Sequence, residues 1–578
     1  MTAGSSPTFW QDARLRPEAA FPLSVTTLTE LLLWRVQMTP GTIAYRDATR
    51  ALTWGETLTE ASRYRRALAT EGLRPGDRVA ICARNRIEWI LFEQAALSLG
   101  LVIVPLFFND RADSLAWCLD HSGARLLLIE DPALWQAVAP AATGLERVIL
   151  FTPVPGDRAQ ALADWLPREG EPLVCPHTDP DALATIVYTS GTTGRPKGVM
   201  LSHRNILEDV RALTLALPTL WPERHRLLSF LPLSHMFERT VGSYVPMAVA
   251  WEVIFGHGVQ FLADDLVRFK PTLIVSVPRV FERIDQRMTE RIGRSGLRRR
   301  LFERTVASGW RRFRGRESLG DRLLRPFLEV LVARRARAAF GGQLRYVFIG
   351  GAAMAPRLFT TFTGLGLIFV HGYGLTETAP VMCCNRLEDN EPLSVGRPLA
   401  GVEVRLDPSG ELCVRGPIVT QGYWRDAEAT RAVLSQDGWF RTGDIARLTD
   451  GRIYLAGRCK EIIVMSNGEK VSPQDAEQAI LSDSVFQQVL LIGEGRPGLV
   501  LLAVAEDVPE AELLSRANAR LHDFPGYVRV RHVLRFDEPW TVENGLLTPT
   551  LKLRRHEIEQ RYGAAIEALY APHPSTPS

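Results

Sequence analysis

The residues from Tyr188 to Gly198 have the composition of a phosphate-binding loop. They read YTSGTTGRPKG and follow an apolar run, Ala184 to Tyr188, that we expect to form a strand. Glycines let backbone N–H groups approach phosphate oxygens, hydroxyls add donors, and Lys197 adds a positive charge. Lys197 lies three residues beyond Gly194 and precedes Gly198, so the spacing is not that of a Walker A loop. On composition alone, a surface turn between two strands explains the segment equally well.

Several other kinds of catalysis have no motif in this sequence. It contains neither a GxSxG nucleophile elbow nor an HExxH zinc motif. Its seven cysteines form no CxxC or Cys/His cluster, and only Cys383 and Cys384 are neighbours. We therefore expect no serine-hydrolase or zinc-protease chemistry, no disulfide and no zinc site.

The elements that must position such a loop are predicted from the apolar patterns. At 578 residues the chain exceeds one hydrophobic core, so at least two domains are expected. Helical and strand patterns alternate from Leu28 to about Pro140, which indicates a mostly parallel sheet covered by helices. A helical stretch is expected around Asp264 to Arg291. Short β-like stretches follow Gly396, and an α+β pattern of roughly one hundred residues closes the chain. The predicted fold class is α/β: a large N-terminal domain of helix-covered, mostly parallel sheets with a β-rich subdomain, and a small mobile α+β C-terminal domain.

The charge is unevenly distributed along the chain. Residues 291–345 hold sixteen arginines and four acidic residues, whereas the formal net charge of the whole chain is only +3. This window is expected to form long helices, since apolar residues recur at helical spacing between the arginines. Either the arginines only solvate helix faces, or they bind an anionic membrane or the phosphates of a nucleotide-like substrate. We expect no nucleic-acid partner, and the sequence does not indicate an oligomeric state.

No apolar run approaches the ~20 residues that span a bilayer. The first residues, MTAGSSPTFWQDARLRPE, lack the cationic-then-apolar pattern of a secretion signal. We therefore expect a cytoplasmic protein. The basic window further suggests peripheral contact with the cytoplasmic face of the membrane.

Residues 188–203, YTSGTTGRPKGVMLSH, closely resemble the phosphate-loop signature of the adenylate-forming (AMP-binding) superfamily, which includes acyl-CoA synthetases, luciferases and peptide-synthetase adenylation domains. The resemblance extends from about Leu28 to Glu567. Among its branches, long-chain fatty acyl-CoA synthetases are favoured by four features: PLSHMFERT (232–240), the arginine-rich insertion, GEGRPGLVLLAV (493–504) and NGLLTPTLK (544–552).

The resemblance implies an ATP-dependent ligase that joins a long-chain fatty acid to coenzyme A through an acyl-AMP intermediate. The substrate carboxylate attacks the α-phosphorus of ATP, so the protein needs no nucleophile of its own, only groups that stabilise charge, and Mg²⁺ on the phosphates. Two alternatives stay open. One is a ligase that loads an acyl-carrier protein or stops at the acyl-adenylate, and the other is a catalytically silent nucleotide-binding scaffold.

The resemblance also assigns roles to individual residues. Thr376 would contact the α-phosphate and Glu377 would hold Mg²⁺, and together with Lys197 and Lys552 they would form the catalytic set. His235 would border the acyl pocket, although a lone histidine on an apolar face can equally be a core residue. The expected nucleotide-binding residues are Thr189, Ser190, Gly191, Thr192, Thr193, Gly194 and Lys197 at the phosphates, Gly351, Ala352, Tyr373 and Gly374 around adenine, Thr376, and Asp444 with Arg458 at the ribose.

The same resemblance predicts two domains that move relative to each other. Residues 1–459 would bind ATP and the acyl group, residues 460–570 would form the mobile domain, and residues 571–578 would be a disordered tail. Lys460 would be the hinge. After adenylation, rotation there would withdraw Lys552 and bring the loop at 466–470 to the thiol channel.

Overall fold

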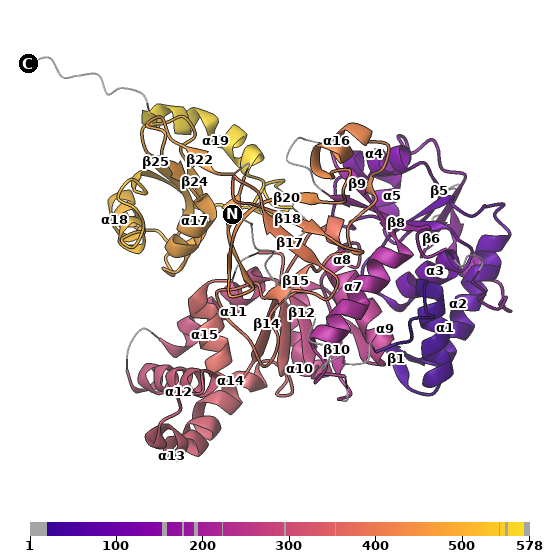
Figure 1. The fold of residues 1–578 in the computed structure, drawn as a ribbon, viewed down its shortest axis with the longest axis horizontal. Coiled ribbons are helices and arrows are strands. Elements are labelled where there is room, and N and C mark those ends of the chain that lie inside the picture. The colour runs from indigo at the N-terminus through magenta and orange to yellow at the C-terminus, as the bar shows by residue number, and fades with distance from the viewer. Residues whose placement is uncertain are drawn as a thin grey trace, which may run out of the picture.

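The computed structural model describes residues 20–152, 159–175, 179–189, 195–221, 223–293, 296–352, 354–459, 461–542, 544–548 and 553–570. Figure 1 shows two large sheets with their covering helices, a separate group of strands, and the C-terminal elements α17 to α19 at one side of the molecule. No helix in the described part of the chain is long and apolar enough to cross a membrane.

The first large sheet is parallel through its centre, with antiparallel strands at both edges. Its central strands, such as β13 with the sequence YVFI, are buried on both faces, which is typical of parallel sheets covered by helices. In spatial order its nine strands are β16 (Arg397–Pro398), β15 (Cys383–Cys384), β14 (Ile368–Tyr373), β13 (Tyr346–Ile349), β12 (Leu273–Ser276), β10 (Arg226–Ser229), β11 (Glu252–Phe255), β1 (Ile43–Arg46) and β2 (Ala51–Thr53).

The second large sheet carries the glycine-rich loop at its antiparallel edge. Strand β8 turns back into β9, and β19 adds to β9 from the opposite side. In spatial order its eight strands are β19 (Gly422–Tyr423), β9 (Lys197–Ser202), β8 (Leu183–Thr189), β4 (Val102–Pro105), β3 (Arg78–Cys82), β5 (Ala124–Ile129), β6 (Arg147–Leu150) and β7 (Gln160–Ala161).

Helices cover these two sheets, and several begin at a side-chain cap. Thr27, Thr53 and Ser202 form capping boxes at α1, α2 and α7, which satisfy backbone N–H groups that have no partner inside the helix. The helical segments up to residue 433 are α1 (Leu28–Met38), α2 (Trp54–Ala69), α3 (Ile87–Leu97), α4 (Ala112–Ser122), α5 (Pro132–Val138), α6 (Leu162–Trp165), α7 (His203–Ala216), α8 (Met236–Arg239), the π-helix η1 (Thr240–Tyr244), α9 (Val245–Val249), the 3₁₀ turn η2 (Val259–Phe261), α10 (Leu262–Phe269), α11 (Pro278–Ile292), α12 (Leu297–Phe313), α13 (Leu319–Leu328), the π-helix η3 (Glu329–Ala333), α14 (Arg334–Ala338), α15 (Pro356–Gly364), the 3₁₀ turn η4 (Thr376–Thr378) and α16 (Ala427–Val433).

The later part of the chain forms smaller sheets. The hydrophobic cores formed from Ile463 onward share no buried residue with the preceding cores, whereas the four-stranded sheet adds Leu412, Val414 and Phe440 to the main core. The four-stranded sheet contains β17 (Glu403–Leu406), β18 (Glu411–Arg415), β20 (Phe440–Thr449) and β21 (Arg452–Arg458), and the C-terminal elements are β22 (Ile463–Val464), β23 (Lys470–Val471), α17 (Pro473–Leu481), β24 (Phe486–Ile492), β25 (Leu499–Ala505), α18 (Glu510–Arg520), β26 (Val530–Phe536) and α19 (Arg555–Tyr570).

This architecture confirms the predicted fold class of a large α/β part, a β-rich part and a small α+β part. The expectation of one helical stretch around Asp264 to Arg291 was wrong, because it contains α10, the buried strand β12 and α11. The long helices expected in the arginine-rich window are present as α12 to α14. The mobility of the C-terminal part stays a prediction.

Two acidic residues are fully buried where α8 and η1 pass between the large sheets. Arg239 pairs with Glu93 at 2.5 Å, and Tyr244 donates a hydrogen bond to the same carboxylate at 2.6 Å. Glu238, the neighbouring residue, is not exposed at all. Burial raises the pKa of Glu238 from 4.5 to about 8, and the nearby Ser229 hydroxyl opposes this only partly. Glu238 is therefore neutral at pH 7.

We predict that Glu238→Gln stabilises the protein at alkaline pH and has little effect at pH 5. The unfolded chain loses the Glu238 proton near pH 4.5, whereas the folded protein holds it up to about pH 8. Stability therefore falls by up to ~1.4 kcal/mol per pH unit across this window, and glutamine removes that loss. Urea unfolding at pH 5 and pH 8.5 measures the effect, with the exposed Glu512→Gln as control. Equal shifts at both pH values would contradict the assignment.

Candidate active site

The β8–β9 hairpin holds the base of the glycine-rich loop. Thr189 and Lys197 are paired across the two strands, so both side chains lie where the loop leaves the sheet. Ser190, Gly191, Thr192, Thr193 and Gly194 lie outside the described residues. The Lys197 ammonium group is 5.2 Å from the ring centre of Tyr423. Tyr423 reaches this position because β19 pairs with β9 next to the loop.

Glu377 lies beside Lys197 and Tyr423, at the start of the short turn η4. The Tyr423 hydroxyl donates a hydrogen bond to Glu377 Oε1 at 2.8 Å, and the backbone N–H of Thr420 donates to the Glu377 carbonyl at 2.8 Å. Burial raises the pKa of the Glu377 carboxyl, while Tyr423, Arg458 and Lys197 pull the pKa back down. A carboxylate that keeps some exposure between two cations suits a site that exchanges ions with a charged ligand.

Asp444 and Arg458 form a second charged group on neighbouring strands. They are register partners in β20 and β21, and Arg458 Nε lies 2.9 Å from Asp444 Oδ1. Tyr373, the last residue of β14, donates a hydrogen bond from its hydroxyl to the other oxygen of Asp444. Burial and the adjacent Asp444 carboxylate raise the pKa of Tyr373 well above its ordinary value. Tyr373 is therefore a neutral donor that fixes the orientation of Asp444.

The strand ends at β13 and β14 place small residues near these groups. Gly351 and Ala352 follow β13 and are exposed. Gly374 follows β14, and a Cβ atom there would lie 1.8 Å from the carbonyl oxygen of Pro380, so only glycine fits. Thr376 opens η4 and is half-buried. In parallel sheets, ligands gather at the carboxyl ends of strands, and these residues occupy such ends.

The structure brings together five of the residues predicted from the sequence, in two groups. Lys197 and Glu377 meet around Tyr423, and Tyr373 and Arg458 meet around Asp444. Lys460 and Lys552 lie outside the described residues. Tyr423 was missed, although it follows a glycine in the QGYW segment, because nothing in the sequence indicated that this segment adds a strand to the glycine-rich hairpin.

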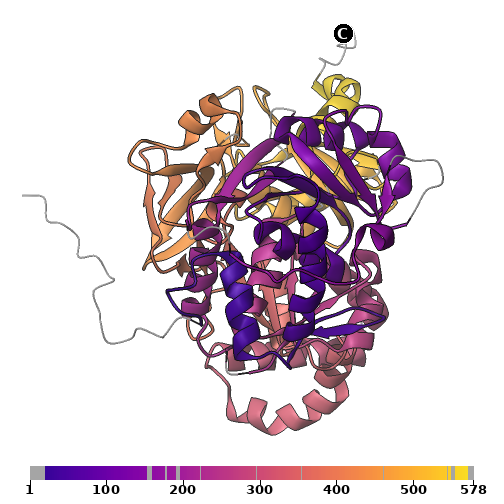
Figure 2. The same ribbon diagram turned by 90° about the vertical axis from the view of Figure 1, so that its right-hand side faces the viewer.

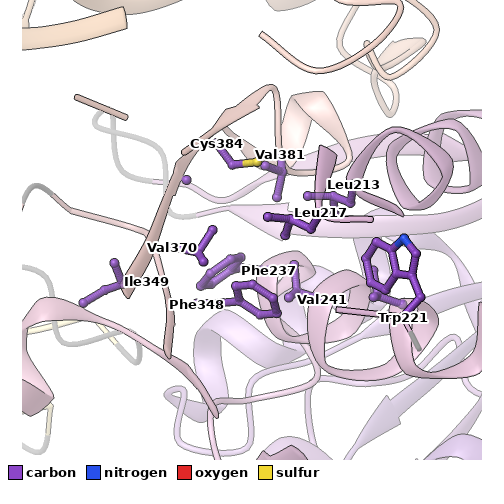
Figure 3. A pocket seen from close by; sticks show the side chains of 12 residues that line it. Leu213, Leu217, Trp221, Phe237, Val241, Phe348, Ile349, Val370, Val381 and Cys384 are labelled. Atoms are coloured by element: carbon purple, nitrogen blue, oxygen red, sulfur yellow. The ribbon is translucent and has the colours of Figure 1, made fainter. Parts of the chain in front are cut away.

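A narrow apolar cavity lies between α7, the α8–η1–α9 segment and strands β13 and β14. Its volume is about 30 Å³, and Figure 3 shows Ile349 toward one end and Trp221 at the other. The Ile349 end borders the candidate nucleotide site, because Ile349 ends β13 and is followed by Gly350 and Gly351. The lining residues are Leu213, Leu217, Trp221, Phe237, Val241, Val245, Phe348, Ile349, Val370, Gly372, Val381 and Cys384.

His235 does not line this cavity. Its ring nitrogen accepts a hydrogen bond from the Phe237 N–H at 3.2 Å and so caps α8. Through this cap it positions Phe237, which does line the cavity. The expected direct contact between His235 and an acyl group stays a prediction.

Comparison with known proteins agrees with this geometry. The AMP-binding enzyme family matches residues 32–424, and the AMP-binding enzyme C-terminal domain matches residues 460–573. The chain therefore belongs to the AMP-binding enzyme family. It is 31% identical to the long-chain-fatty-acid–CoA ligase FadD15 of Mycobacterium bovis, over 92% of this chain and 95% of that protein. It is 28% identical to the chloroplastic long-chain-fatty-acid–[acyl-carrier-protein] ligase AEE15 of Arabidopsis thaliana, over 91% of this chain and 84% of that protein.

The same fold occurs in solved structures. The crystal structure of ATP-bound MatB from Rhodopseudomonas palustris superposes with a TM-score of 0.75 at 22% identity, covering 94% of this chain and 100% of that one. This likeness establishes that the two proteins share a fold.

Proposed function

We propose that this protein is an ATP-dependent long-chain fatty acid–CoA ligase that works through an acyl-AMP intermediate. The observation that carries the proposal is the juxtaposition of two charged groups with an apolar cavity. Ile349 and Gly372 line the cavity. Gly351, two residues after Ile349, and Tyr373, the residue after Gly372, belong to the candidate nucleotide site. An acid whose tail fills the cavity would therefore hold its carboxylate near a bound nucleotide. The relative FadD15 is named for the same activity.

The residues at the site suit the two ends of ATP. Lys197, with the Thr189 hydroxyl opposite, would neutralise phosphate oxygens at the glycine-rich loop. The Asp444 carboxylate, oriented by Tyr373 and Arg458, would accept hydrogen bonds from the ribose hydroxyls. Thr376 lies between the two groups in the chain and would donate to the α-phosphate. Gly351 and Ala352 would leave room for the adenine edge, next to the ring of Tyr373.

The donor set also suits Mg²⁺. No group of three or more His, Cys, Asp or Glu side chains among the described residues could hold a metal ion by itself. Mg²⁺ is commonly bound by one or two carboxylates together with substrate phosphates, and the half-buried Glu377 is such a carboxylate. When bound, the ion would offset charge on the departing pyrophosphate. The raised pKa of Glu377 shows that the protein leaves this carboxylate incompletely compensated.

Transfer to the thiol would require the C-terminal part to move. We place the boundary at residues 459 and 460, with Lys460 as the hinge and Lys552 as the cation that bridges the carboxylate and α-phosphate during adenylation. The hydrophobic cores support a separate unit, since those formed from Ile463 onward share no buried residue with the earlier ones. Rotation would then bring the loop at residues 466–470 to coenzyme A.

The identity of the acceptor thiol can be tested directly by supplying the protein with each of two acceptors. AEE15, a relative at 28% identity, is named for ligation to an acyl-carrier protein, so that acceptor is the competing candidate. Purified protein would receive ATP, Mg²⁺ and palmitate with either coenzyme A or a holo acyl-carrier protein, and the thioester would be measured by mass spectrometry. Acyl-CoA formation at least tenfold faster than carrier loading is expected. Preferential carrier loading, or acyl-AMP alone, would overturn the proposal.

We predict that Glu377→Gln lowers acid-dependent ATP–pyrophosphate exchange at least 100-fold. The substitution keeps the size of the side chain and removes the proposed metal carboxylate, a loss of the scale seen for one charge-stabilising group. The melting temperature should change little, because Glu377 forms no ion pair with any of the described residues. Glu428→Gln, on the exposed surface of α16, is the matched control. Near-normal exchange by folded Glu377→Gln would contradict the metal assignment.

We predict that Trp221 limits the length of the acyl chain. It closes the cavity end farthest from Ile349, and its indole N–H is anchored to the Thr214 carbonyl at 2.7 Å. The cavity, at about 30 Å³, holds one or two water molecules, so a long chain must displace lining side chains. Each extra methylene that becomes buried among apolar side chains contributes ~0.8 kcal/mol, which corresponds to a roughly fourfold increase in kcat/KM.

In a series of straight-chain acids, Trp221→Ala should therefore raise kcat/KM for acids longer than the wild-type optimum by about tenfold. Trp221→Phe keeps a ring at this position and should leave the optimum within two carbons of the wild type. An unchanged length profile for Trp221→Ala would show that the chain ends elsewhere.

A further inference from the structure

Helices α12 to α14 project from the main body of the protein at one end (Figures 1 and 2). The apolar face of helix α12 packs against the main body of the protein. Trp310 packs against Phe359 of α15 with ring centres 6.3 Å apart, and Phe302 and Phe313 also pack against the main core. At the crossing of these helices, a Cβ on Gly309 would lie 2.0 Å from the Gly364 carbonyl oxygen, so the backbones nearly touch. Phe302, Trp310 and Phe313 therefore contribute to the packing of α12 against the protein.

Helix α13 and the π-helix η3 instead leave an apolar face uncovered. Leu319 is 78% exposed, Leu323 83% and Phe327 60%. These residues recur every four positions, so they line one face of the helix, and Val330 extends it into η3. Leu328, on another face, is buried and holds the helix to the protein. Soluble surfaces scatter exposed apolar residues singly, whereas a contiguous group of this kind marks an interaction site.

The charges around this face are strongly one-sided. All four acidic residues of the window are already neutralised inside it: Glu303 pairs with Arg299, Glu317 with Arg322 and Arg325, Asp321 with Arg311, and Glu329 with Arg337. Within the described residues, several arginines of the same window form no ion pair. These are Arg298, Arg300, Arg312, Arg316, Arg334 and Arg335. The group of helices that carries the apolar face therefore also carries a surplus of positive charge.

We propose that the apolar face of α13 and η3 inserts into the headgroup layer of an anionic membrane, with the arginines of α12 and α14 on the lipid phosphates. An amphipathic helix with apolar and cationic faces lies in the plane of a bilayer in this way without crossing it. Each arginine near an anionic surface adds to the attraction. The role of the contact rests on the proposed function, since long-chain acids partition into membranes and docking would supply them to the cavity.

A second copy of this chain is a poorer occupant of the face. Two copies meeting through α13 would bring the same unpaired arginines together, and like charges at close range repel. A membrane offers the opposite charge and an apolar layer at once. We therefore expect the membrane to cover this face, and the experiment below also tests for self-association.

The test uses a pair of leucines matched in type and exposure. Leu323, 83% exposed on α13, and Leu23, 79% exposed elsewhere, would each be changed to Asp in the full-length protein. Co-sedimentation would compare vesicles of phosphatidylglycerol and phosphatidylcholine with vesicles of phosphatidylcholine alone. Wild type and Leu23→Asp should bind the anionic vesicles, and more weakly as salt rises. Leu323→Asp should bind at least tenfold more weakly.

Three results would overturn the docking surface. These are equal binding to both kinds of vesicle, equal binding by wild type and Leu323→Asp, or concentration-dependent dimerisation that Leu323→Asp abolishes. Thermal unfolding would confirm that both variants fold, as expected for exposed positions. Ligation of palmitate in the absence of vesicles should be the same for wild type and Leu323→Asp. Absent ligation by both proteins would count against the proposed function and would leave the vesicle result intact.

Discussion

The site depends on one carboxylate that the protein only partly compensates. Glu377 is held by the Tyr423 hydroxyl at 2.8 Å and lies within the electrostatic reach of Lys197 and Arg458. Those residues come from η4, β19, β9 and β21, so both the glycine-rich hairpin and the four-stranded sheet must be in place before this carboxylate has its partners. If Glu377 formed a complete ion pair, the folded protein would be more stable, but the site would bind a metal and phosphates less readily.

The acyl cavity follows from the same construction. Strands β13 and β14 turn apolar side chains, among them Phe348 and Val370, into the cavity and then end in glycines at the nucleotide site. On the proposed function, one pair of strands would determine both where a tail lies and where its carboxylate emerges. The distance between the two sites would then supply the positioning on which attack at phosphorus depends.

Much of this could be predicted from the sequence, and the failures have physical reasons. The bounds of β25 and the burial of β13 follow from apolar runs flanked by polar residues. Strand β12 was missed because three apolar residues and a serine between two helices carry no period of their own. Tyr423 was missed because its role depends on pairing with β9, which is distant in sequence. The periodic patterns of α12 and α13 do not reveal which apolar face meets α15 and which stays exposed.

The pH dependence of acid-dependent ATP–pyrophosphate exchange tests this account most directly. Activity should fall as pH decreases through the pKa of Glu377, because protonation removes the carboxylate. The Tyr423 hydrogen bond lowers the pKa of Glu377, so Tyr423→Phe should move the acidic limb of the profile to higher pH while exchange persists at alkaline pH. An acidic limb at the same pH in wild type and Tyr423→Phe, or exchange that does not require the fatty acid, would contradict the account.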